Sequence, residues 1–202
     1  QLPESAIKEL QKIYEHAKQE KNMPQMMKAH LTKASLSIDI TPDSLDHELS
    51  GLKIWVAEEK DPVYKAILNN LLGYCTLDTG KRDEAAIDAA IAYFRLSLQD
   101  KDILSRKSAA DYRPMTVSKE LSGKYCGDNM YQLLARQAIW RLSGYFIVNP
   151  VLAEKIQTEI LSIYDELIDF YQQQGMTDAR LLLMLDKLNY QGNDISLSLI
   201  HI

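Results

Sequence analysis

The sequence predicts an all-α protein, built as an array of antiparallel helical hairpins with about eight or nine helices. Apolar residues recur at helical spacing along most of the 202 residues. Five helices are expected to start near residues 4, 24, 42, 62 and 83, so that pairs of helices repeat about every 40 residues. Only 8 Gly and 6 Pro are present, too few for a many-turned β-sandwich or barrel. A plain helical bundle is the alternative.

In the first half of the chain, each expected helix combines a start signal with one apolar face. Pro24 suits a first turn, and Thr41-Pro42 and Asp61-Pro62 supply a capping side chain followed by proline. The second helix is expected to end before Ile38, and the fifth to run from about Asp83 to Leu98. The five apolar faces consist of Ile7, Leu10, Ile13, Tyr14 and Ala17; Met27, Leu31 and Ala34; Leu45, Leu49, Leu52, Trp55 and Val56; Val63, Ala66, Ile67, Leu71 and Tyr74; and Ile87, Ala90, Ile91, Phe94 and Leu98.

The second half contains a long polar segment before helix returns. A short helical turn is expected at residues 102–108, and a long loop at about 109–128, where the periodicity disappears. Asn129 and Asn149-Pro150 are start signals for two further helices, the second of which is expected to be the longest. Gly175 suits the residue just past a helix, and Thr177 would cap the last one, to about Tyr190. Residues 1–192 therefore form the predicted domain, and 193–202 a tail, either a short strand or disordered.

The hairpin repeat fits the tetratricopeptide pattern only loosely. Tyr14, Ala17 and Ala29 occupy compatible positions, but no Trp-Leu-Gly core is present. The prediction is therefore a tetratricopeptide-like array rather than a typical member of that repeat class.

The composition argues against nucleic acid and the membrane interior as partners of this chain. The formal net charge is -5, which provides no positive field for phosphate backbones and disfavours nucleic acid. No apolar run approaches the roughly 18 residues needed to cross a bilayer, so no membrane insertion by this segment is expected. The chain begins at Gln1 rather than Met, and we expect a processed protein or an excised fragment. Proteins are the expected partners.

No residue pattern points to catalysis, a cofactor or a metal. The four histidines lie far apart and none has a ligand spacing, although His16 and His30 could face each other across the first hairpin. Acidic pairs such as Asp165-Glu166 point about 100° apart on a helix, and are expected to be solvated. An all-α enzyme would need polar side chains that converge in a pocket. The sequence therefore favours a chain that is not an enzyme.

Cys75 and Cys126 are compatible with one disulfide or with two free thiols. The tetrapeptide from Cys126 to Asn129 superficially resembles the Cys-Gly-Glu-Gln motif that forms an internal thioester. Asn129 is one methylene shorter than Gln, and Asp128 replaces Glu. The role of Asn129 as a helix cap explains its presence better.

Two features are candidates for contact with a partner. Tyr112 and Arg113 in the long loop are the candidate contact residues, because loops carry function more often than packed faces do. The larger aromatic residues at helical spacing are expected in the core, with an aromatic groove on the concave face as the alternative. These aromatic residues are Trp55, Tyr93, Phe94, Trp140 and Phe170.

Four stretches, in order along the chain from about residue 5 to 190, resemble the N-terminal helical region of large bacterial alpha-2-macroglobulin-like proteins. Their joint order carries the resemblance, since each alone is only a patterned helix. One departure is a short stretch at residues 74–83, where that family usually has a longer aromatic and basic segment. The stretches are residues 6–18 with Lys21-Asn22, Pro24-Gln25 and Lys28-Ala29; residues 93–100 with Ile103-Leu104 and Asp111-Tyr112; residues 131–138; and residues 163–171 with Ala179, Leu183, Leu185 and Leu188.

The resemblance implies an exported protein, periplasmic or at the cell surface, in which macroglobulin domains and a bait region trap proteases. The helical region would be a non-catalytic scaffold that contacts the other domains of the same long chain, proteases or envelope proteins. No catalytic residue of that family falls on this sequence. A stand-alone helical-repeat module that binds a peptide or protein on its concave face is the alternative.

Overall fold

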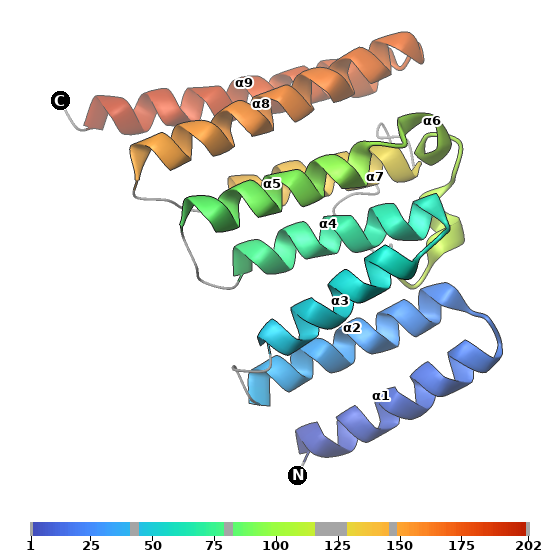
Figure 1. Cartoon of the computed structure of the whole chain (residues 1–202). Helices are drawn as coiled ribbons and strands as arrows, with labels where there is room; N and C mark the ends of the chain where they lie inside the picture. Colours follow the sequence, from blue (N-terminus) through green and yellow to red (C-terminus); the bar gives the residue numbers. More distant parts are fainter. Residues whose placement is uncertain (1, 41–44, 79–82, 116–128, 146–148, 201–202) are drawn as a thin grey trace.

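The computed structural model describes residues 2–40, 45–78, 83–115, 129–145 and 149–200. Within these residues the chain forms nine α-helices and one 3₁₀ turn, with no strand, so the predicted all-helical class is confirmed (Figure 1). The elements are α1 (Leu2–Gln19), α2 (Met23–Ile40), α3 (Leu45–Glu58), α4 (Pro62–Asp78), α5 (Glu84–Leu98), α6 (Lys101–Leu104), η2 (Ala109–Tyr112), α7 (Met130–Ser143), α8 (Pro150–Gln173) and α9 (Thr177–Ile200).

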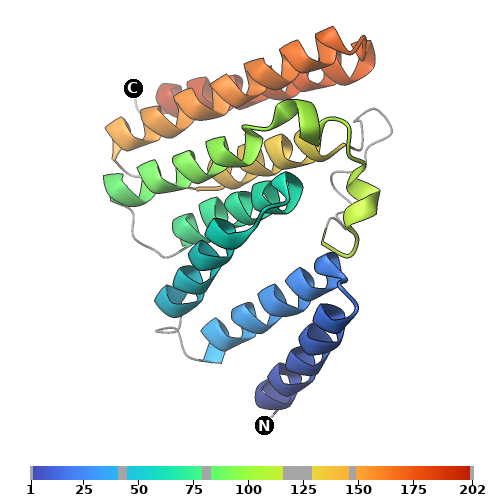
Figure 2. The ribbon, with the colours of Figure 1, turned by 45° about the vertical axis from the view of Figure 1, so that its right-hand side comes forward.

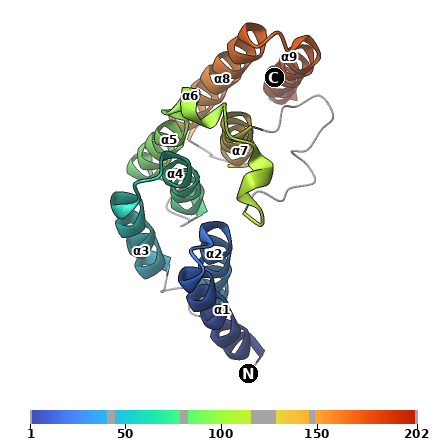
Figure 3. The same cartoon turned by 90° about the vertical axis from the view of Figure 1, so that its right-hand side faces the viewer.

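The long helices lie side by side in chain order, with α1 at one end of the molecule and α8 and α9 at the other (Figure 1). Seen nearly along the helices, α3, α5 and α8 lie on one side, and α2, α4, α7 and α9 on the other (Figure 3). The closest partners are α1 with α2 and α4 with α5, while α7, α8 and α9 pack in succession. The predicted array of helical hairpins is therefore confirmed.

Three of the predicted start signals form side-chain caps, and Asp83, predicted only as the approximate start of its helix, forms a fourth. In each, an oxygen of the capping residue accepts a hydrogen bond from a backbone amide of the first turn, which would otherwise lack a partner. Thr41-Pro42 lies outside the described residues. The capping contacts are Asp61 with the amide of Val63 at 2.8 Å, Asp83 with Ala86 at 2.8 Å, Asn129 with Gln132 at 3.0 Å and Asn149 with Val151 at 3.0 Å.

Two tight connections between helices use the left-handed backbone region. Gly175 joins α8 to α9 with a φ of 69°, as its position after the helix predicted. In the α1–α2 turn the same region is occupied by Lys21, with a φ of 56°. The amide of Asn22 closes this turn by donating to the carbonyl oxygen of Ala17 at 2.8 Å. Both connections are short, and the helices that they join are antiparallel.

Three boundaries differ from the sequence prediction. Helix α2 continues to Ile40 instead of ending before Ile38, and α9 continues to Ile200, where the sequence predicted a short strand or disorder. Once a helix is established, each added residue gains a hydrogen bond. The alternation of apolar and polar residues from Ile195 to Leu199, which is typical of a strand, does not override that gain. The predicted loop begins with η2, beside the ends of α4 and α7 (Figure 2). Residues 116–128 lie outside the described residues.

The core lies mainly among α4, α5, α7 and α8. Phe94 and Phe170 are buried there as predicted, and Trp55 and Tyr93 are half-buried. The prediction for Trp140 is wrong, because its side chain is 56% exposed. The adjacent residues Ile139 and Leu142 face inward, and the 100° step of the helix turns Trp140 outward, where the guanidinium of Arg141 lies 4.3 Å from its ring centroid.

Candidate interaction surfaces

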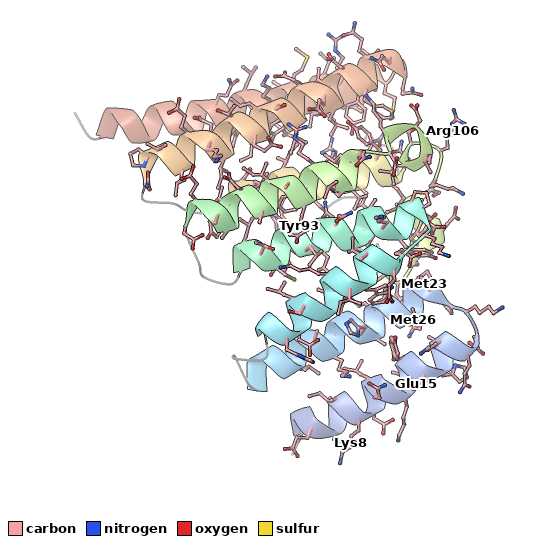
Figure 4. All side chains as sticks on the ribbon, viewed as in Figure 1. Lys8, Glu15, Met23, Met26, Tyr93 and Arg106 are labelled. Carbon is pink, nitrogen blue, oxygen red and sulfur yellow. The ribbon has the colours of Figure 1, made fainter. Side chains whose placement is uncertain are left out.

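An open apolar cleft separates the α1–α2 hairpin from α3. Its volume is about 520 Å³. Figure 4 labels Met23 and Met26, which lie between α2 and α3 near the α1–α2 turn. We call this feature the hairpin cleft; its lining residues are Tyr14, Lys18, Lys21, Met23, Met26, His30, Gly51, Ile54, Trp55 and Glu58.

The cleft exists because the first hairpin is packed closely within itself but touches α3 sparsely. The α3 wall presents Gly51, Ile54, Trp55 and Glu58, which follow helical spacing along one face. Ile54 is 61% exposed, and a Cβ added at Gly51 would meet nothing within 4 Å. This face of α3 is therefore apolar and largely uncovered.

Aromatic rings form the floor of the cleft. The imidazole of His30 lies between Tyr14, with ring centroids 6.0 Å apart, and Trp55, at 5.3 Å and nearly perpendicular. Burial in this stack lowers the pKa of His30; Glu48 raises it in part, and Lys33 lowers it further. The buried Nε2 atom of His30 has no hydrogen-bond partner among the described residues. His16, which could have faced His30 across the hairpin, is exposed and lies 3.4 Å from Glu20.

The rim of the cleft is charged on both sides. Lys18 and Lys21 come from the end of α1 and the turn that follows it, and Glu58 comes from the end of α3. Within the described part of the chain, no ion pair engages any of these three side chains. Their charges are therefore available to a molecule that enters the cleft.

A second apolar surface lies on the last helix. Five large side chains of α9 are between 38% and 62% exposed, while Ala179 and Leu183 of the same helix are buried. The five fall within eight residues, and most follow the spacing of one helical face. We call this surface the α9 stripe; it consists of Leu181, Leu182, Met184, Leu185 and Leu188.

The two predicted contact residues differ in burial: Tyr112 is buried and Arg113 is exposed. Tyr112 is only 8% exposed, and its ring packs edge-on against Tyr64 at 5.4 Å. Burial, with smaller effects of Asp61 and the other nearby groups, raises the pKa of the Tyr112 hydroxyl to about 12. Its ring therefore packs in the core, and contact of Tyr112 with a partner stays a prediction. Arg113 is exposed, and contact with a partner through Arg113 stays a prediction.

Ion pairs connect helices across the opposite end of the array. Asp165 and Glu166 diverge as predicted from their spacing, but both are paired instead of merely solvated. Lys187 of α9 lies 2.5 Å from Asp165, and Arg95 of α5 pairs with Glu166. Arg95 also pairs with Glu159, which is 15% exposed. Sequence reasoning missed these pairs, because their partners lie on different helices.

The structure describes only some of the remaining sequence candidates. In the described part of the chain, no three His, Cys, Asp or Glu side chains lie close enough together to hold a metal ion. Asn129 caps α7, whereas Cys126 and Asp128 lie outside the described residues, so a pairing of Cys126 with Cys75 stays open. None of the described helices combines the length and the hydropathy that crossing a membrane requires.

Comparison with known proteins returns no relative: no family model, curated protein or solved structure matches the chain.

Proposed function

We propose that this chain is a non-catalytic helical scaffold of an alpha-2-macroglobulin-like envelope protein involved in protease inhibition, and that it docks onto another unit of that protein through the α9 stripe. The sequence resemblance supports the family and an exported, periplasmic or surface location. The α9 stripe is the observation that carries the docking role.

The stripe differs from ordinary surface leucines because its members are contiguous. Single exposed apolar residues are common on any protein, but contiguous apolar patches mark interaction surfaces. An interior helix of the array, such as α4, has neighbours on several sides, whereas α9 packs on α8 and leaves its outer face uncovered. Burying the stripe against a further protein unit would stabilise the assembly by about 25 cal/mol for each Å² of apolar surface removed from water.

Photo-crosslinking tests the docking role. A photoreactive amino acid is placed at Leu185 in the full-length protein, in the cells that make it, and the products are identified by mass spectrometry. Val151 on α8, which is also exposed, serves as the matched control position. We expect Leu185 to crosslink to a macroglobulin-type domain of the same polypeptide, and Val151 not to.

Two results would contradict the proposal. One is equal crosslinking from both positions. The other is a reading frame that contains neither an export signal nor macroglobulin domains.

The hairpin cleft favours a second candidate function, a helical-repeat module that binds a peptide or protein segment. Its volume of about 520 Å³ lies within the range of roughly 300–1,000 Å³ typical of binding pockets. Its lining is mostly apolar and aromatic, with a few polar groups at the rim. A cleft of this composition can hold the apolar side chains of a peptide or protein segment.

Substitution in the cleft tests the second function directly. Ile54→Asp places a charge in the apolar wall without disturbing a buried side chain, and Val151→Asp is the matched exposed control. Binding of a helical peptide should be lost in the first variant and kept in the second. Equal binding by both variants would place the peptide site elsewhere on the molecule.

A further inference from the structure

We propose that the hairpin cleft recognises an amphipathic helix whose flank is acidic. This inference rests on the second candidate function, that the cleft is a binding site, and specifies the chemistry of its ligand.

The shape of the cleft suits a helix. Its two walls are themselves helices, and on the α3 wall Gly51, Ile54 and Glu58 follow the i, i+3, i+7 spacing that a docked helix can match with its own anchors. Gly51 leaves room at one end for a close approach. The volume of about 520 Å³ accommodates a few large apolar side chains, and the exposed Ile54 and the ring of Trp55 offer them apolar contact.

Two methionines of the cleft lining adapt to different apolar anchors. Met23 and Met26 have flexible, polarisable side chains that tolerate different partner shapes. Such surfaces discriminate weakly among apolar ligands. The choice of ligand therefore depends on the charged rim more than on the methionines.

The charge of the rim selects an acidic ligand. Lys18 and Lys21 place two cations on the hairpin side, against the single carboxylate of Glu58 on the α3 side. No ion pair among the described residues joins Lys18 or Lys21 to an acidic side chain, and Glu20, their neighbour in the sequence, lies 3.4 Å from His16. In a chain with a net charge of -5, this positive rim is a local exception. Carboxylates along the flank of a docked helix would lie against it.

Two synthetic peptides test the inference on the full chain. Both have the same leucine stripe and a length of about four helical turns, and they differ only in Glu or Lys along the flanks. Fluorescence of Trp55 reports occupancy of the cleft, after Trp140→Phe removes the other tryptophan. We expect the Glu peptide to bind at least about tenfold more tightly at low salt, and its advantage to shrink as salt screens the rim.

Charge reversal locates the preference. The double variant Lys18→Glu, Lys21→Glu should reverse the order of the two peptides. The matched control is Lys8→Glu, Lys28→Glu, in the same hairpin but outside the cleft lining, where Figure 4 shows Lys8 on the outer side of α1. The control should leave the preference unchanged.

The outcomes distinguish the inference from the function on which it rests. Equal binding of both peptides, lost in Ile54→Asp, would overturn the acidic preference and keep the cleft as a binding site. If neither peptide changes Trp55 fluorescence, both the inference and the second candidate function fail.

Discussion

The first three helices and the block from α4 to α9 bury their side chains very differently. Among the described side chains of α1, α2 and α3, Met27 is the only one less than 2% exposed, whereas α4, α5, α7 and α8 each contribute several. Polar contacts follow the same division. In the block, Asn70 donates to the carbonyl oxygen of Leu134 at 3.1 Å and to Ser97 at 3.3 Å, and Arg95 connects α5 to α8.

The first hairpin depends on fewer contacts with the rest of the array. Lys33 donates to Gln11 at 2.8 Å within the hairpin, and the stack of Tyr14, His30 and Trp55 connects it to α3. A region with few buried contacts opens more readily than a sealed core. The difference indicates that the block sets the stability of the protein, while the hairpin can adjust to a ligand.

The largest loss of stability is expected from a charge buried in the block from α4 to α9. Ile160 on α8 is fully buried, and Ile160→Asp should cost more than about 4 kcal/mol, enough to unfold the domain. The exposed Ile54→Asp is the matched control and should change stability by less than about 0.5 kcal/mol. Thermal melts followed by circular dichroism measure both. An unchanged melting temperature for Ile160→Asp would contradict the assignment of that face of α8 to the core.

A smaller loss of stability is expected when the ion pairs between α5 and α8 are removed. Arg95→Ala leaves the mostly buried carboxylate of Glu159 without its cation, and should lower the free energy of unfolding by about 1–3 kcal/mol. Arg106→Ala, at an exposed position, is the control and should have little effect. Urea denaturation measures the difference, and equal losses in both variants would show that the link contributes nothing specific.

Hydrogen exchange tests whether the hairpin opens on its own. Backbone amides within α1 and α2 should exchange at least about tenfold faster than those of α8, which corresponds to roughly 1.4 kcal/mol in opening free energy. A peptide bound in the cleft should slow the exchange of the hairpin without changing that of α8. Equal protection throughout would mean that the array opens as one unit.

The smallest change in stability is expected from the effect of pH on His30. Burial lowers the pKa of His30 below its ordinary value of 6.5, so the folded protein favours the neutral ring. The unfolded chain therefore binds the proton more readily, and the stability contributed by neutral His30 is present above pH 6.5 and declines as the pH falls through it. His30→Phe should flatten this decline in thermal melts across that range, and His16→Phe should not. Identical pH profiles for the two variants would contradict the assignment.

Local signals predicted the fold well, and the surfaces poorly. Asp61, Asn129 and Asn149 could be identified as caps because each contact reaches only two or three residues along the chain. The cleft could not be predicted, since it combines side chains of three helices. For α9, the run from Leu181 to Leu185 is apolar all around, but periodicity alone does not say which side a neighbour covers.

At Lys21, the stability of the turn and the charge of the cleft rim favour different residues. A non-glycine residue in the left-handed region is disfavoured by roughly 1–2 kcal/mol. Helices that end with a residue in this region usually have glycine there, whereas this chain has Lys21. Replacement by glycine would therefore make the turn more stable but remove a cation from the edge of the cleft. If natural variants of this protein keep a lysine or arginine here at the expense of stability, the position is under selection for its charge.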